Sequence, residues 1–154
     1  MGTTTDRNGS SHEKLHMRFN TAQLQELSGV RREQLRHWKK VLPPLIGRDG
    51  RCEQYTFPEV LAVSVISAFV DDLGISVSRL GPCADDLFAL MHESDDVNAL
   101  PLAIYFTADG ELKHGAAPEG SAFATVRLGD LVTKLRSRLA PAQRRQLSLP
   151  LAAQ

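Results

Sequence analysis

Residues 20–38, NTAQLQELSGVRREQLRHW, contain two short helical patterns joined by a glycine. Asn20 is a good N-cap, and Gln23 stands three residues later, where a capping box requires it. Gly29 can adopt the left-handed conformation with which many helices end. The stretch therefore predicts a helix that begins at Asn20, a tight turn, and a second helix directly after the turn.

The second helix is expected from Arg31 to about Val41. Leu35 and Trp38 are three residues apart and would share its inner face. Pro43-Pro44 ends the pattern, because proline lacks the amide hydrogen that a helix needs. The basic residues that occupy the other faces are Arg32, Arg36 and Lys39.

A hairpin and a third helix are expected next. Asp49-Gly50 favours a tight turn between short strands in the segment 45–55. Thr56 and Glu59 form a capping-box pattern at the start of the third helix. The apolar residues up to Val70 predict that this helix is buried on several sides, and Leu73-Gly74 would end it.

The second half of the chain begins with helices and continues with strands. Ser76 is expected to open a short helix, and Pro82–His92 to form another. The alternating residues from Leu102 to Thr107 are typical of a strand. Asp109-Gly110 then favours a hairpin turn that leads into a second strand ending at His114.

One more strand and one more helix complete the pattern. The sequence alternates again from Ala122 to Leu128, and a last helix carries an apolar stripe with a spacing of four residues: Leu131, Leu135 and Leu139. Pro141 would end that helix. These elements predict a small three-stranded sheet with one helix.

The formal net charge is zero, but the charged residues are segregated along the chain. The formal charge is +3 up to Val70, −8 from Asp71 to Glu111 and +5 after Glu111. Between Arg31 and Arg51 there are seven basic residues and only two acidic ones. Such a patch can bind an anionic polymer even in a neutral protein.

Several function classes find no support in the sequence. The apolar stretch Val60–Val70 is too short to cross a bilayer, and the polar N-terminus has no apolar signal core. Cys52 and Cys83 cannot form a disulfide framework and lack zinc-ligand spacing. The histidines show no spacing typical of an acid–base or metal site. They are His12, His16, His37, His92 and His114. We expect a cytoplasmic protein that is not an enzyme and binds neither cofactor nor metal.

The order of helix, glycine turn, basic helix, proline stop, basic hairpin and capped helix resembles the MerR family of winged helix-turn-helix regulators. The resemblance spans about residues 19–80. The residues that carry it are Leu24-x-x-Leu27-Ser28-Gly29-Val30, Leu35-Arg36-His37-Trp38, Leu42-Pro43-Pro44, Arg48-Asp49-Gly50, Tyr55-Thr56 and Leu73-Gly74-Ile75-Ser76.

The resemblance implies a homodimer that binds double-stranded DNA at an inverted repeat. The second helix would enter the major groove, and the wing would reach the flanking backbone. Arginine suits bases and phosphates because its fork donates two hydrogen bonds at once. Leu35, Trp38 and Tyr55 would pack rather than contact DNA. The expected DNA-binding residues are Arg31, Arg32, Gln34, Arg36, Lys39, Arg48 and Arg51.

Three features depart from the family's pattern. Arg31 stands where members usually carry a small capping residue, a loss of about 1 kcal/mol that a phosphate contact could offset. Glu53 and Gln54 replace basic residues expected just before the closing tyrosine of the wing. The long dimerisation helix of typical activators is missing, so the metal- or drug-sensing chemistry of the family is not carried over.

The tail contains a second motif. Gln146–Leu151, QLSLPL, resembles the hexameric motif by which bacterial proteins bind the DNA polymerase sliding clamp. Such a motif must be extended and accessible, and the chain beyond Pro141 is expected to be flexible. Its anchors would be Gln146, Leu147, Leu149 and Leu151. An alternative function is therefore a replication- or repair-associated factor, of plasmid or phage, that the clamp recruits.

Together these patterns predict an α+β protein with a MerR-like winged helix-turn-helix at the N-terminus, followed by helices and a small three-stranded antiparallel sheet with one C-terminal helix. The expected divisions are an arm (1–17), the winged domain (18–80), a body that is a candidate dimerisation module (81–140) and a flexible tail (141–154). The expected function is transcriptional regulation by a nucleoid-associated dimer that contacts DNA through the helix 31–41 and the wing 45–55.

Overall fold

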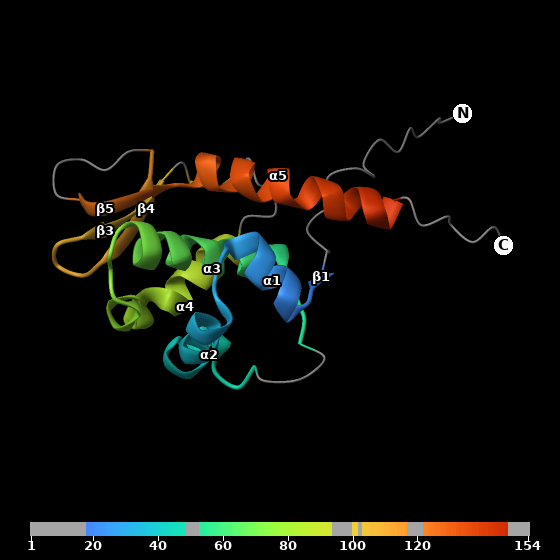
Figure 1. Ribbon diagram of the computed structural model, residues 1–154. Helices are drawn as coiled ribbons and strands as arrows, with labels where there is room; N and C mark the ends of the chain where they lie inside the picture. Colours follow the sequence, from blue (N-terminus) through green and yellow to red (C-terminus); the bar gives the residue numbers. More distant parts are fainter. Residues whose placement is uncertain (1–17, 49–52, 94–99, 102, 117–121, 148–154) are drawn as a thin grey trace, which may run out of the picture.

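The computed structural model describes residues 18–48, 53–93, 100–101, 103–116 and 122–147. In this part of the chain, five α-helices accompany a three-stranded antiparallel sheet, and the last helix follows the last strand (Figure 1). The expected α+β class, with its small sheet and C-terminal helix, is confirmed. The expected arm at 1–17 lies outside the described residues.

The N-terminal elements begin with a two-residue strand that no local pattern in the sequence predicts. β1 (Arg18–Phe19) pairs antiparallel with β2 (Tyr55–Thr56), so that Phe19 lies opposite Tyr55. Both of these aromatic side chains are buried. Between the two strands the chain forms α1 (Thr21–Ser28), α2 (Arg32–Val41) and the 3-10 helix η2 (Pro43–Leu45).

The expected capping box at the start of α1 and the expected glycine turn at its end are both present. The Asn20 side chain accepts a hydrogen bond of 2.8 Å from the amide of Gln23, whose own side chain accepts one from the Asn20 amide. Gly29 has a φ of +77° and donates its amide to the carbonyl of Gln25. This conformation is costly for a residue with a Cβ atom.

The expected hairpin between short strands is wrong for the residues that can be compared. Pro43–Leu45 is helical, and Ile46–Arg48 form no strand. Tyr55–Thr56 does form a strand, but its partner is β1 rather than the segment before Arg48. A pairing between residues this far apart leaves no local sequence signal. The proposed turn, Asp49-Gly50, lies outside the described residues.

The third helix forms the centre of the molecule. α3 (Phe57–Ser67) begins with the expected capping box between Thr56 and Glu59. All but one of its residues are buried, which confirms that it is covered on several sides. It continues as a π-helical turn, η3 (Ala68–Asp72), and ends at Gly74, which has a φ of +70°.

The two helices expected after Ser76 are a single helix, α4 (Val77–Glu93), with Pro82 inside it. A proline within a helix costs about 3 kcal/mol. The helix nevertheless continues because one apolar stripe runs past the proline on both sides and is buried, and each large apolar side chain contributes about 1.5–3 kcal/mol on burial. The stripe consists of Leu80, Ala84, Leu87, Phe88 and Met91.

The sheet has the strand order β4-β3-β5 and is antiparallel throughout. β3 (Ala103–Thr107) pairs with β4 (Leu112–Gly115) on one side and with β5 (Ala122–Arg127) on the other. The expected hairpin is confirmed, because Gly110 has a φ of +88° and donates its amide to the carbonyl of Thr107.

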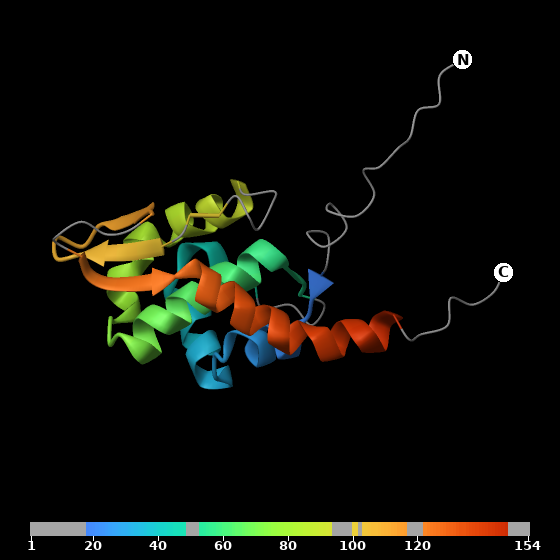
Figure 2. The same cartoon turned by 90° about the horizontal axis from the view of Figure 1, so that it is seen from above.

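The last helix, α5 (Leu128–Leu147), crosses α1 and α3 and then extends beyond them (Figures 1 and 2). Its buried stripe is Leu128, Val132, Leu135 and Leu139. The expectation that Pro141 ends this helix is wrong, because the part of the expected flexible tail up to Leu147 is helical. The residues from Ala142 to Leu147 are alanine, glutamine, arginine and leucine, all strong helix formers.

One hydrophobic cluster holds these elements together, with buried residues from Phe19 to Leu139. The rings of Phe69 in η3 and Phe106 in β3 lie 6.4 Å apart within it. The expected division after Leu80 falls inside α4, and the cluster includes side chains from both sides of that division. Among the described residues, no helix has the length and apolar character that a membrane crossing requires.

Candidate nucleic-acid interface

α2 is fixed in place by its inner face. Leu35 and Trp38 are each 2% exposed and belong to the central cluster together with Val30 and Leu42. The predictions that Leu35, Trp38 and Tyr55 pack inside are confirmed. Because the inner face is buried in the core, the opposite face of α2 has a fixed orientation at the surface.

The outer face of α2 carries a stripe of cations. Arg32, Arg36 and Lys40 follow one another at a spacing of four residues and are all exposed. At a rise of 1.5 Å per residue the stripe is about 12 Å long. One acidic side chain accompanies it: Glu33 lies 3.7 Å from Arg36, but both side chains are more than half exposed, so the pair is weak.

Arg31 and Gln34 are held by hydrogen bonds at the start of α2. Arg31 is the N-cap residue, and its side chain accepts no capping hydrogen bond from a helix amide, because a guanidinium has no acceptor. The Gln34 side chain compensates in part: its oxygen accepts the Arg31 amide at 3.1 Å and the Arg31 Nε at 3.3 Å. The Gln34 amide nitrogen donates to Asp71 at 2.8 Å. Gln34 therefore binds other residues of the protein.

Lys39 and Arg48 form ion pairs within the protein, unlike the exposed cations of α2. The Lys39 ammonium lies 2.8 Å from Glu53, and both side chains are at most 13% exposed. Arg48 forms an ion pair with Glu59, donates to the carbonyl of Gln54 at 2.8 Å, and lies over the ring of Tyr55 at 4.6 Å. These cations join α2 and the chain after η2 to the start of α3.

The contacts of Lys39 and Tyr55 with Glu53 change the pKa values of both side chains. Burial lowers the pKa of Lys39, but hydrogen bonds to Glu53 and Tyr55 raise it, and the net result is a raised pKa. Burial and a hydrogen bond of 2.7 Å to Glu53 raise the pKa of the Tyr55 hydroxyl. Within the described residues, the other Glu53 oxygen has no hydrogen bond, and it lies 4.0 Å from Arg48 Nε. Glu53 therefore joins Lys39, Tyr55 and Arg48.

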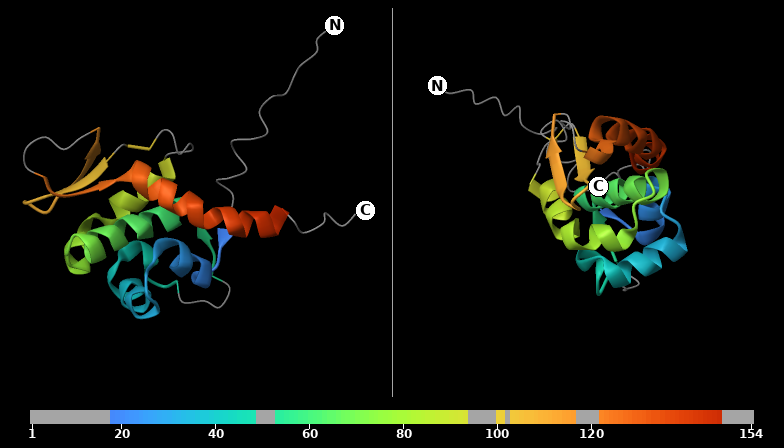
Figure 3. Two further views of the ribbon diagram at one scale, coloured as in Figure 1. Left: turned by 45° about the horizontal axis from the view of Figure 1, so that its top comes forward. Right: turned by 90° about the vertical axis from the view of Figure 1, so that its left-hand side faces the viewer.

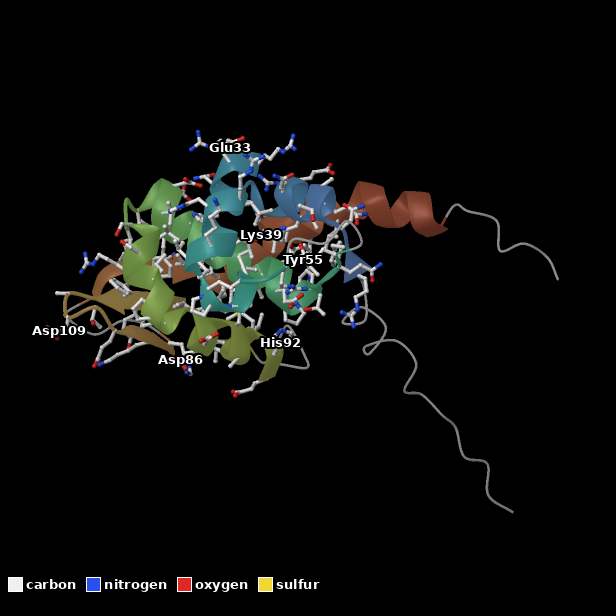
Figure 4. All side chains as sticks on the ribbon, turned by 90° about the horizontal axis from the view of Figure 1, so that it is seen from below. Glu33, Lys39, Tyr55, Asp86, His92 and Asp109 are labelled. Atoms are coloured by element: carbon white, nitrogen blue, oxygen red, sulfur yellow. The ribbon has the colours of Figure 1, made fainter. Side chains whose placement is uncertain are left out.

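Figure 4 shows that the residues around Glu53 lie apart from the outer face of α2. Lys39 and Tyr55 lie close together near the middle of the view, whereas Glu33 is at the outer edge of α2. Asp86 and Asp109 lie on other edges of the same view, away from Glu33. α5 is on the opposite side of the molecule from α2 (Figure 3). Asp86 of α4 and Asp109 of the hairpin therefore lie away from the outer edge of α2 that Glu33 marks.

The expected DNA-binding residues thus fall into three groups. Arg31, Arg32 and Arg36 are exposed at one surface. Gln34, Lys39 and Arg48 bind other residues of the protein. Arg51 lies outside the described residues. Of the expected clamp-binding residues, Gln146 and Leu147 end α5, while Leu149 and Leu151 lie outside the described residues.

Sequence reasoning missed four residues of this region. Lys40 could have been found from its spacing of four residues to Arg36. Arg138 of α5 donates to the carbonyl of Leu27 at 2.7 Å and thereby caps the end of α1. The partners of Glu53 and Asp71 left no local signal, because Asp71 meets Gln34 across 37 positions of the chain.

The described residues offer little to a cofactor or metal. They contain no group of three His, Cys, Asp or Glu side chains that could hold a metal ion. An open hollow of about 410 Å³ lies between η3, β5 and α5. Its charged residues carry both signs (Asp72, Arg127, Asp130, Lys134), so they define no particular ligand.

Comparisons with models of known protein families, with curated proteins and with solved structures find no match for this chain.

Proposed function

We propose that the chain binds double-stranded DNA in the manner of a MerR-like regulator, with α2 in the major groove. The observation that carries the proposal is the exposed stripe of Arg32, Arg36 and Lys40 on a helix whose opposite face is buried in the core. A helix held in this way can enter a groove about 12 Å wide without losing its own packing.

The charges of the stripe suit this partner. Each arginine can fork onto a guanine edge or a phosphate, and Lys40 can add a phosphate contact as a point charge. Lys39 is excluded from this role because its ammonium is bound to Glu53. The proposed interface is therefore smaller than the basic stretch from Arg31 to Arg51, and it lies on the outer face of α2.

The regulatory part of the proposal rests on the resemblance of residues 19–80 to the MerR family. A member of that family acts as a dimer on an inverted repeat, and this chain would bind in the same way. Such a protein would be located in the cytoplasm, at the nucleoid. The long dimerisation helix of typical activators is missing, so the proposal assigns no effector.

The test is the affinity for a duplex that the wild-type protein selects from a randomised pool. R32A and R36A should each weaken binding by about 1–3 kcal/mol if the arginine contacts a base. R136A is the matched control, because Arg136 is an exposed arginine on α5, on the opposite side of the molecule. If no duplex is selected, or if R32A, R36A and R136A bind alike, the proposal is wrong.

A further inference from the structure

A chain of hydrogen bonds connects the end of α3 with the start of α2. Ser67 donates its hydroxyl to one Asp71 oxygen at 3.0 Å, and the Gln34 amide nitrogen donates to the other at 2.8 Å. The Gln34 oxygen then accepts two hydrogen bonds from Arg31, one from its backbone amide and one from Nε. Each atom in this chain has the donor or acceptor character that the next one requires.

The chain fixes the orientation of the Gln34 amide group. A carboxylate accepts hydrogen bonds and donates none, so Asp71 binds the nitrogen of Gln34 and turns its oxygen towards Arg31. Within the guanidinium, that oxygen is bound by Nε alone. Neither of the two terminal amino groups of the guanidinium has a hydrogen-bond partner among the described residues, so both can fork onto a phosphate or a base.

We propose that Asp71 is a positioning residue for DNA binding, which acts through Gln34 to hold the Arg31 guanidinium ready for a DNA contact. This inference rests on the proposed function. It assigns Gln34 a role within the protein instead of a contact with a base. A side chain that is already oriented loses less freedom on binding, so the relay increases affinity without touching DNA.

The charge of Asp71 allows a sharp test, because electrostatics and positioning predict opposite signs. An acidic side chain beside a DNA-binding surface repels phosphates, so its removal should strengthen binding if charge alone matters. Asp72 is the matched control: it is the next residue, it is also exposed, and it has no part in the relay. D71A and D72A remove the same charge from nearly the same place.

The experiment compares the affinity of both variants for the duplex selected by the wild-type protein. D71A should weaken binding by about threefold to tenfold, which corresponds to the loss of one hydrogen bond. D72A should bind as the wild type does, or slightly more tightly. D71N keeps an acceptor for the Gln34 amide and should restore binding to the wild-type value or above it.

The R31A background shows whether the effect passes through Arg31. There, D71A should cause no further loss of affinity. The proposal is overturned if D71A and D72A change affinity alike, if D71N does not restore binding, or if D71A weakens R31A as much as it weakens the wild type. R36A distinguishes a failure of the relay from a failure of the proposed function. If R36A binds the duplex weakly while D71A and D72A bind it with equal affinity, only the relay fails. If R32A and R36A both bind as R136A does, the proposed function fails.

Discussion

Arg36 and Arg48 belong to the same basic stretch but have opposite surroundings. Arg36 is on the outer face of α2 and has one weak ionic contact, with Glu33. Arg48 is mostly buried and binds Glu59, the carbonyl of Gln54 and the ring of Tyr55. One arginine has its charge free for a partner, while the charge of the other is used within the fold. The density of basic residues along a sequence therefore overstates the size of a binding surface.

The largest expected effect comes from Glu53, which joins Lys39, Arg48 and Tyr55. E53A removes the anion that binds the mostly buried Lys39 and the acceptor of the Tyr55 hydroxyl, while Arg48 keeps its pair with Glu59, and it should lower the free energy of unfolding by about 3 kcal/mol. Urea denaturation measures this loss. The matched control is E33A, whose carboxylate forms only the exposed pair with Arg36 and should change stability by less than 1 kcal/mol. Equal losses would mean that the two regions do not differ as described.

The neighbouring lysines of α2 should show a smaller effect of the same kind. K39M keeps the apolar stem but breaks the charged hydrogen bond to Glu53, so it should cost about 1.5–3 kcal/mol of stability. K40M should leave stability within about 0.5 kcal/mol and weaken DNA binding instead. Denaturation and binding titrations of both variants check the pair. The division of α2 into two faces is wrong if K40M unfolds more easily than K39M.

The pH dependence should show a third and smaller effect. The pKa values of Lys39 and Tyr55 are raised in the folded protein, so each group stabilises the fold below its unfolded pKa, near 10.5 and 10.0. That contribution is lost as the pH rises through the higher folded values. These two groups should therefore leave the free energy of unfolding unchanged below about pH 10 and lower it above that pH. The fall should be smaller in Y55F, and an equal fall would exclude Tyr55 as a cause.

Local signals in the sequence were sufficient for much of the fold. Asn20 with Gln23 and Thr56 with Glu59 marked helix starts, and Gly29 and Gly110 marked turns, because these patterns depend on residues close together in the chain. The alternating segments gave the strands of the sheet for the same reason.

Long-range packing decided the rest. β1 pairs with β2 across the whole of α1 and α2, which a local pattern does not show. Pro82 and Pro141 were expected to bound helices, yet both lie within one, and the buried stripe of α4 offsets the cost at Pro82. The binding of the tail to a sliding clamp stays a prediction, although α5 now includes the first two residues of that motif.

The positions of the basic residues in the sequence predicted part of the candidate interface. The structure corrects the rest, because it shows which of these residues form ion pairs within the protein. Arg32 and Arg36 are exposed as expected, because residues on the outer face of an amphipathic helix remain in solvent. Lys39 and Arg48 are not, because Glu53 and Glu59 lie where they can bind them. Such partners depend on the tertiary structure, and the spacing of charges along the chain does not specify them.

The most direct test of the central claim is the salt dependence of DNA binding by the wild type, R36A and R48A. Each phosphate contact adds about 0.9 to the slope of log affinity against log salt concentration. R36A should lower the magnitude of this slope by about 1, because Arg36 is on the exposed stripe. R48A, measured where it remains folded, should leave the slope unchanged. A slope that falls in R48A but not in R36A would contradict the account.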